Sequence, residues 1–341
     1  MALANSLSPA GIRGDSPIHA EPAEEALLAD VALSDAPSSA RAQAVRKLTS
    51  QGILLQVARL DKDGGVRALA AARLSDQAAL THIAKSDVDW RARAAAASTL
   101  KDPLLLAEIA EEGLDCQVRE VATTRIVDQA LLARIAASDR AWGVRKVATA
   151  RVDDQAVLAR IAASDPDWHV RQVAATKLGD DSLLARIACS DPDWHVCQTA
   201  AASLGNQALL AHVARSARQW RARGAAVAKL SDQAVVAEIA AKDREWPVRE
   251  AAAAKLVDQS LVARIARADP DPRVRAAAVR KLSNQVLLAE IAVKDQDRKV
   301  RAIAAGLLTD RPVLAHIANS DRNRTVREAA TQALLQGCAH T

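Results

Sequence analysis

Residues 154–179 read DQAVLARIAASDPDWHVRQVAATKLG, and variants of this stretch follow one another along the chain with a period of 26 residues. Ile161 followed by Ala162 marks the register, because Ile-Ala or Val-Ala recurs here twelve times without an insertion, within residues 24–335. A short unit that repeats at a fixed period is typical of solenoids, in which each unit buries its apolar face only against its neighbours. The repeat therefore decides the fold class before any other feature does.

The apolar residues of each unit recur at helical rather than strand spacing. Leu158 and Ile161 are three residues apart, and Val170 and Ala174 are four apart, so each pair falls on one helix face. The column that contains Ala174 is alanine in all twelve units, as is the column directly after the isoleucine. Two such columns predict two places where helix backbones approach closely. We therefore expect an all-α protein, an α/α superhelix of twelve 26-residue repeats with two helices each.

Turn and capping residues divide each unit into its two helices. Asp154 is expected to cap a first helix over residues 155–163. Asp165, which is followed by proline, is expected to cap a second helix over residues 166–178. Gly179 is expected to end that helix in a left-handed conformation. Helices this short are unstable alone, so their stability must come from stacking against neighbouring units.

The composition agrees with thin layers between short helices. Half of the 341 residues are hydrophobic, yet the chain has six Trp, no Phe and no Tyr. The four cysteines form no CxxC pair, and the first 22 residues lack the apolar run of a secretory signal. No stretch has the roughly 20 apolar residues of a membrane helix. We expect a cytoplasmic protein with a disordered leader (residues 1–23), one solenoid (residues 24–335) and a short tail (residues 336–341).

The second helix of the unit carries a more specific pattern, in which Asp165 is followed by Val170 and Arg171. This D-x(4)-V-R spacing resembles that of HEAT repeats, and the unit length is similar to that of short bacterial HEAT-like repeats and of the leucine-rich-repeat variant family. The resemblance implies a hydrogen-bonded ladder of Asp and Arg through the stack. Its members would include Asp139, Arg145, Asp165, Arg171, Asp243, Arg249, Asp269 and Arg275. The iron–sulfur cysteines associated with the variant family have no counterpart here, so no cofactor is expected.

The ladder columns have three departures, at Gly113 and Ala217 in the aspartate column and at Cys197 in the arginine column. An aligned row of arginines would also suit a nucleic-acid track. The accompanying aspartates favour the structural interpretation, because planar guanidinium groups pair well with carboxylates. Cys197 would then interrupt the ladder and weaken one joint.

All six Trp occupy a single column near the start of the second helix. They either pack as a lid on the neighbouring turn or form a row of flat surfaces for a ligand. The next column is partly basic and is expected to face solvent. A column near the helix end is mostly Lys or Arg, which also complements the helix dipole. The candidate partner-binding residues from these columns are Trp90, Trp142, Trp168, Trp194, Trp220, Trp246, Arg91, His169, His195, Arg221, Arg273, Lys177, Lys229 and Lys255.

No catalytic motif, nucleotide-binding loop or metal-ligand spacing occurs, so neither an enzyme nor a metal site is expected. The leading interpretation is a non-enzymatic scaffold whose concave face, lined by the second helices, binds a protein or an acidic peptide. The alternative is nucleic-acid binding, because HEAT-like DNA glycosylases use a basic concave surface with Trp side chains. The net charge of +5 is small for tracking phosphates. Bilin lyases also occur among HEAT-like proteins, but no residue here selects that activity.

Overall fold

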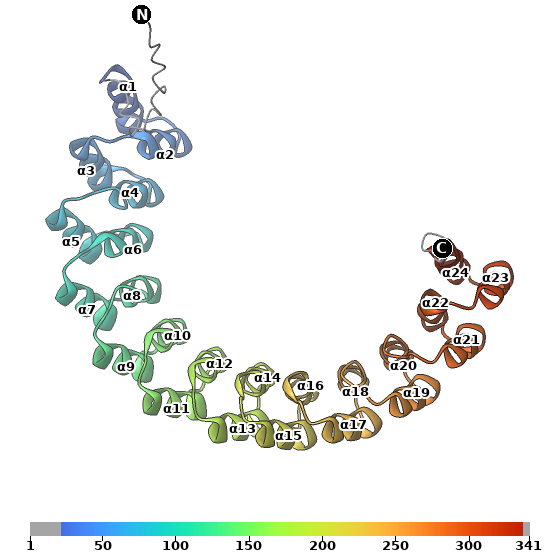
Figure 1. Ribbon diagram of the computed structural model, residues 1–341. Coiled ribbons are helices and arrows are strands. Elements are labelled where there is room, and N and C mark those ends of the chain that lie inside the picture. The colour runs from blue at the N-terminus through green and yellow to red at the C-terminus, as the bar shows by residue number, and fades with distance from the viewer. Residues whose placement is uncertain (1–21, 337–341) are drawn as a thin grey trace, which may run out of the picture. The chain divides into compact units, whose positions relative to one another are not determined.

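The computed structural model describes residues 22–336, which form 24 helices and no strand (Figure 1). The expected all-α class with two helices in each of twelve repeats is thereby confirmed. The expected leader, residues 1–23, lies outside the described residues except for Pro22 and Ala23, which begin α1. The expected tail also lies outside them, apart from Gln336 at the end of α24. The described residues divide into two compact units, residues 22–131 and 132–336, by the contacts that they make.

Each repeat supplies an odd-numbered helix followed by an even-numbered helix. The helices of the first unit are α1 (Pro22–Leu33), α2 (Ser38–Lys47), α3 (Gln51–Leu60), α4 (Gly64–Ala71), α5 (Gln77–Ser86), α6 (Trp90–Thr99), α7 (Pro103–Glu112) and α8 (Cys116–Thr123). The boundary between the units falls within α9 (Gln129–Ser138). The helices of the second unit are α10 (Trp142–Arg151), α11 (Gln155–Ser164), α12 (Trp168–Lys177), α13 (Asp181–Ser190), α14 (Trp194–Ser203), α15 (Gln207–Ser216), α16 (Trp220–Lys229), α17 (Gln233–Lys242), α18 (Trp246–Ala253), α19 (Gln259–Ala268), α20 (Pro272–Val279), α21 (Gln285–Lys294), α22 (Arg298–Leu307), α23 (Arg311–Ser320) and α24 (Arg324–Gln336).

The even-numbered helices of the second unit form the inner side of its curve. Each odd-numbered helix packs on the even-numbered helix that follows it, and successive even-numbered helices also pack on one another. In this unit the contacts between successive even-numbered helices are more extensive than those between successive odd-numbered helices. Figure 1 accordingly shows the even-numbered helices along the inside of the arc from α10 to α24. We call the solvent-facing side of these even-numbered helices the inner surface.

The residues that carry the repeat pattern form the core. Leu158, Ile161 and Ala162 are buried on α11, and Val170 and Ala174 are buried on α12. The alanines let the short helices approach closely, while leucine, isoleucine and valine fill the layer between them. Burying a branched aliphatic side chain contributes roughly 1.5–3 kcal/mol, so the stacking of repeats supplies the stability that the isolated helices lack.

The capping prediction is confirmed for the first helix of the repeat and is wrong for the second. Asp154 accepts hydrogen bonds from two amides in the first turn of α11. α12 begins only at Trp168, and its cap is Asp167, whose carboxylate accepts from the amide two residues further on. Asp165 is unavailable as a cap because its carboxylate accepts from Arg145 and from the amide of Asp167.

The prediction that Gly179 ends the second helix in a left-handed conformation is also wrong. Leu178 ends α12 with extended dihedral angles, φ −73° and ψ 130°, and Gly179 does not have a positive φ. The Gly179 amide instead donates to Oε1 of Gln155 at 2.8 Å, and Nε2 of Gln155 donates to the carbonyl of Lys177 at 3.3 Å. The glutamine side chain thus connects the start of the first helix to the end of the second helix within one repeat. The same pair of bonds is made by Gln51, Gln207, Gln233, Gln259 and Gln285.

A ladder of arginine and aspartate joins successive repeats. Nε and Nη2 of Arg171 donate to the two carboxylate oxygens of Asp191 at 2.9 Å, and Nη1 donates to the carbonyl of Asp165 at 2.9 Å. Each arginine therefore uses the carboxylate of the next repeat and the backbone of its own. The Arg171 and Asp191 side chains are only 10% and 6% exposed. The same bidentate rung joins Arg41 to Asp61, Arg67 to Asp87, Arg145 to Asp165, Arg223 to Asp243, Arg249 to Asp269, Arg275 to Asp295 and Arg301 to Asp321.

In one rung of the second unit, both the arginine and its partner aspartate are replaced by other residues. The carboxylate that an arginine at position 197 would contact belongs to position 217, and these positions hold Cys197 and Ala217, which are 0% and 2% exposed. The sulfur of Cys197 lies 3.2 Å from the carbonyl oxygen of Asp191, where other repeats place an arginine nitrogen. Burial, and then the charges of Asp191 and Asp193, raise the pKa of Cys197 to about 11, so the thiol stays protonated. We call the Cys197 and Ala217 pair the missing rung; it leaves no buried charge without a partner.

Acid is expected to destabilise the fold through the ladder. Burial raises the pKa of Asp61, Asp87 and Asp321, but hydrogen bonds from arginines and backbone amides outweigh it and hold each pKa below the ordinary 3.8. A carboxylate with a lowered pKa in the folded state stabilises the fold above its unfolded-state pKa, and this contribution is lost as the pH falls through its folded-state pKa. We therefore expect the free energy of unfolding, measured by urea titration, to decrease steadily below about pH 4. A free energy of unfolding that is the same at about pH 2 as at neutral pH would contradict this.

Candidate partner-binding surface

Each of the six Trp is the first residue of an even-numbered helix: α6, α10, α12, α14, α16 or α18. Trp90 belongs to the first unit, and the other five belong to the second. In α6, α12 and α14 the residue before the Trp is an aspartate that caps the helix. Trp90 and Trp142 are 40% and 45% exposed, and the other four are partly buried. The turn that starts the helix therefore also positions the indole.

In the second unit the Trp rings alternate with flat side chains from the column that follows them. The ring centroid of His169 lies 4.5 Å from that of Trp142 and 3.6 Å from that of Trp168, with the planes inclined by 16° and 25°. His195 lies between Trp168 and Trp194 in the same way, at 4.2 Å and 3.4 Å. Each imidazole is therefore stacked against an indole on both of its faces.

Arg221 continues this alternation. Its guanidinium carbon lies 4.1 Å from the ring centroid of Trp194 and 4.4 Å from that of Trp220, which are cation–π distances. The alternation stops where proline follows Trp246, whose ring instead lies 3.6 Å from the guanidinium carbon of Arg273. In the first unit, Arg91 lies 5.8 Å from the ring centroid of Trp90. We call the continuous series the aromatic–cationic stack; it consists of Trp142, His169, Trp168, His195, Trp194, Arg221 and Trp220.

The stack limits which ring surfaces a ligand can reach. Trp168 lies between His169 and His195, and Trp194 lies between His195 and Arg221, so neither indole presents an open face. Only the edges of these two rings are left for contact with a ligand. Both rings pack against neighbouring side chains on their two faces. A binding role for them stays a prediction and would use the ring edges and the cations beside them.

The imidazoles are fixed by the helix caps. Nδ1 of His169 lies 3.0 Å from Oδ1 of Asp167, the same oxygen that accepts the His169 amide at 2.9 Å. His195 and Asp193 repeat this arrangement. The two histidines were expected to face solvent, but they are partly buried because each packs on the Trp of the preceding repeat. The sequence feature that could have predicted this packing is the recurrence, in successive repeats, of Trp followed by a residue with a flat side chain.

The lysines near the helix ends bind backbone carbonyls of the preceding repeat. Nζ of Lys177 donates to the carbonyl of Ala150 at 2.9 Å, and Lys229 and Lys255 donate to the corresponding carbonyls of Ala202 and Ala228. These contacts place the ammonium groups at helix C-termini, where the backbone carbonyls and the helix dipole favour a cation. Their contribution to partner binding stays a prediction. Of the candidate arginines beside the Trp column, Arg91 and Arg273 lie 3.7 Å and 3.3 Å from the carboxylates of Asp89 and Asp271, whereas Arg221 forms no ion pair within residues 22–336.

Small side chains cover the middle of the inner surface. Ala202, Ala228 and Ala254 are exposed near the ends of α14, α16 and α18. Gly224 lies one turn after Arg221 on α16, and a Cβ added to it would meet nothing within 4 Å. The positions equivalent to Gly224 on the adjacent inner helices carry Gln198, which is exposed, and Glu250, which is partly buried. The close approach of a partner backbone is therefore easiest at α16.

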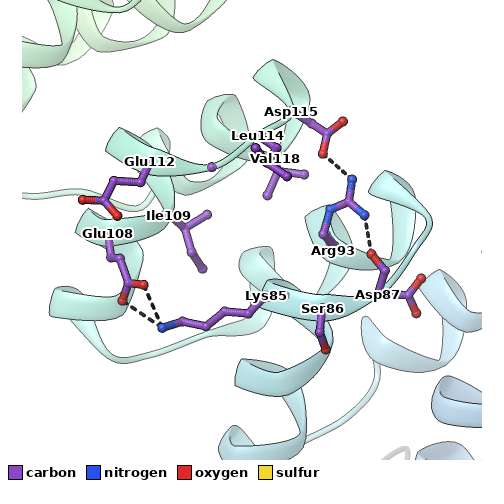
Figure 2. A pocket seen from close by; sticks show the side chains of 12 residues that line it. Lys85, Ser86, Asp87, Arg93, Glu108, Ile109, Glu112, Leu114, Asp115 and Val118 are labelled. Atoms are coloured by element: carbon purple, nitrogen blue, oxygen red, sulfur yellow. Dashed lines mark hydrogen bonds and ion pairs between the residues drawn. The ribbon is translucent and has the colours of Figure 1, made fainter.

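A cleft of about 450 Å³ lies in the first unit, where Gly113 replaces the ladder aspartate (Figure 2). Arg93 pairs instead with Asp115, and it also donates to the carbonyl of Asp87. Nζ of Lys85 donates to Glu108 at 2.8 Å across the cleft. Figure 2 shows both cations directed at their partners. The cleft therefore presents no unpaired cation to a ligand.

Residues 22–336 show neither a metal-binding cluster nor a membrane-spanning helix. No group of three His, Cys, Asp or Glu side chains in that range is arranged to hold a metal ion. None of the helices there is both long enough and apolar enough to cross a membrane.

The comparisons with known proteins concern the fold. No protein-family model and no curated protein matches the chain. Among solved structures, the chain is similar to one from a Kap95p–RanGDP complex, with 12% identity and a TM-score of 0.59, over 94% of this chain and 61% of the other. It is also similar to a leucine-rich repeat variant with a novel repetitive structural motif, with 22% identity and a TM-score of 0.47, over 74% of this chain and 88% of the other. Another match is a designed armadillo repeat protein, with 17% identity and a TM-score of 0.11, over 91% and 98%.

The similarity to the chain from the Kap95p–RanGDP complex agrees with what the repeats show by themselves. The described residues form two-helix repeats whose D-x(4)-V-R positions build an arginine–aspartate ladder between neighbours. The Kap95p complex shares this type of architecture over nearly the whole chain. The protein therefore has the fold of a HEAT-like repeat α-solenoid.

Proposed function

We propose that the protein is a non-enzymatic scaffold that binds a protein partner on the inner surface of its second unit. The observation that carries the proposal is the combination of small exposed residues, such as Ala228 and Ala254, with the neighbouring aromatic–cationic stack. Trp and Arg are the residues enriched where interfaces gain most of their free energy. The similar chain from the Kap95p–RanGDP complex comes from a structure whose subject is protein binding, and this supports the proposal by fold analogy only.

A nucleic-acid partner has less support in the second unit. Proteins that bind single strands commonly stack bases on open aromatic faces and follow the backbone with a continuous cationic groove. The faces of Trp168 and Trp194 are covered, and Lys177 and Lys229 donate to backbone carbonyls. A protein, which can use ring edges and a few charged contacts, fits this surface better.

Site-specific photo-crosslinking tests the proposal. A photoreactive amino acid at Ala228 or Ala254 should form an adduct with one discrete protein in an extract of the source cells, identified by mass spectrometry. The matched control carries the same group at Ala241, which is exposed on the odd-numbered helix α17 of the same unit. The proposal predicts that the adduct forms from the two inner positions and is absent from Ala241. Adducts of equal yield from all three positions, or adducts only with nucleic acid, would contradict it.

A further inference from the structure

The turn before α16 differs in charge from every other turn between the paired helices of the second unit. Ala217 occupies the position of the ladder aspartate, and Gln219 occupies the position of the cap and makes no side-chain capping bond. This turn therefore contains no carboxylate. Each of the other turns keeps at least one, from Asp139, Asp165, Asp167, Asp191, Asp193, Asp243, Glu245, Asp269, Asp271, Asp295, Asp297 and Asp321.

Three arginines gather where these carboxylates are missing. Arg218 and Arg221 flank the first residue of α16, and Arg244 reaches back from the following turn, where its Nη2 donates to the carbonyl of Arg218 at 3.3 Å. Arg218 and Arg244 are exposed, and Arg221 is partly buried between two indoles. None of the three forms an ion pair with any residue between 22 and 336. We call Arg218, Arg221 and Arg244 the arginine cluster.

The carboxylates around the cluster do not neutralise it. Asp243 accepts two hydrogen bonds from Arg223 at 2.7 Å and 2.9 Å, so it belongs to the ladder. Asp193 accepts from the backbone and from the ring of His195. Glu245, in the turn that contributes Arg244, forms no ion pair with the cluster. Glu250, on the adjacent helix α18, forms no ion pair with the cluster either. Three arginines without an ion-pair partner therefore occupy the start of α16 and the turns before α16 and α18.

We propose that the arginine cluster anchors an acidic linear segment of the partner protein. This inference rests on the proposed function and specifies the chemical character of the partner segment. A guanidinium group presents paired N–H donors that match a carboxylate. Arg221 is already held between Trp194 and Trp220, so little side-chain freedom is lost when it binds. Gly224, one helical turn further along α16, leaves room for the backbone of the bound segment.

The position of the cluster favours a peptide over a nucleic acid. Acidic residues return in the turns on both sides, at Asp193 and Glu245, so the unbalanced positive charge is confined to about one repeat. A phosphate backbone would need cations spaced along many repeats. A short run of Asp or Glu side chains needs only a local cluster, with neighbouring contacts supplied by small residues and ring edges.

Fluorescence anisotropy with a labelled decaglutamate peptide tests the inference on the full chain. Two triple variants carry the same change in charge. One replaces the cluster, as Arg218→Gln, Arg221→Gln and Arg244→Gln; the other replaces exposed arginines of odd-numbered helices, as Arg160→Gln, Arg186→Gln and Arg264→Gln. We expect the cluster variant to bind decaglutamate about tenfold or more weakly than the native protein, and the control variant to change by less than about threefold.

Three outcomes would overturn the inference: equal losses in the two triple variants, equal binding of decaglutamate and decaglutamine by the native protein, or tighter cluster-dependent binding of a ten-nucleotide thymidine oligonucleotide. Thermal melting followed by circular dichroism checks the fold of each variant. The double variant Arg218→Gln/Arg244→Gln leaves the stack intact and should still lose most of the affinity, whatever the triple variant does to stability.

Failure of this inference is distinguishable from failure of the proposed function. If the crosslinks from Ala228 and Ala254 persist in the cluster variant, the inner surface binds protein and the cluster is not the anchor. If those crosslinks are missing in the native protein, the proposed function itself is wrong.

Discussion

Arg171→Ala should lower the free energy of unfolding by about 3–5 kcal/mol, because it leaves Asp191 buried without its partner. Both side chains are 10% exposed or less, and the hydrogen bond to Asp191 raises the pKa of Arg171, as expected for a cation held by a buried carboxylate. The substitution also removes the bond to the Asp165 carbonyl, which fixes the turn before α12. Urea titration followed by circular dichroism gives the change in unfolding free energy.

The loss should also be local, because solenoid units interact mainly with their nearest neighbours. Hydrogen exchange is expected to rise first in α11 to α14, the helices of the two repeats that the rung joins. Arg160→Ala is the matched control, since Arg160 is exposed on α11. Equal destabilisation by Arg171→Ala and Arg160→Ala would show that the rung does not stabilise the stack.

Rebuilding the missing rung should reveal a strong coupling between Cys197 and Ala217. Cys197→Arg alone buries a guanidinium without a carboxylate, and Ala217→Asp alone buries a carboxylate without an arginine. Each single substitution should therefore cost several kcal/mol, at about the 3–5 kcal/mol of a broken buried pair. The double variant should recover much of this loss, because the two side chains would meet as Arg223 and Asp243 do.

A double-mutant cycle from urea titrations measures the coupling, which we expect to reach about 2–3 kcal/mol in favour of the pair. A matched cycle at two exposed positions, Arg160→Ala and Ala241→Asp, should show additivity, because these residues lie on different odd-numbered helices. If the Cys197 and Ala217 substitutions are also additive, the pairing between successive repeats does not extend to this joint.

The repeat made most of the fold predictable, because twelve units without an insertion place the core residues of every unit in the same columns. Leu158, Ile161 and Ala174 lie in the core at the spacing that predicted them. The predicted cap of the second helix, Asp165, was wrong because Asp165 and Asp167 are both residues that can cap a helix and the sequence alone does not distinguish them. Only the structure shows that Asp165 is occupied by an arginine of the preceding repeat.

The candidate surface was less predictable because its contacts cross between repeats. A helical wheel of one repeat places His169 towards solvent, whereas the stack places it against Trp142 of the repeat before. The sequence shows Ala217 as a departure from the aspartate column, but it does not show which arginines lie beside it. The structure shows that Arg244 of the following turn reaches the carbonyl of Arg218 and that Arg221 packs between two indoles.

Hydrogen exchange measured by mass spectrometry, with and without saturating decaglutamate, tests most directly whether the inner surface of the second unit binds an acidic segment. The predicted result is slower exchange in α14, α16 and the start of α18, around the arginine cluster, with no change in α15 and α17 of the same repeats. Protection of α15 and α17, or no protection at saturating peptide, would contradict the binding of an acidic segment at this surface.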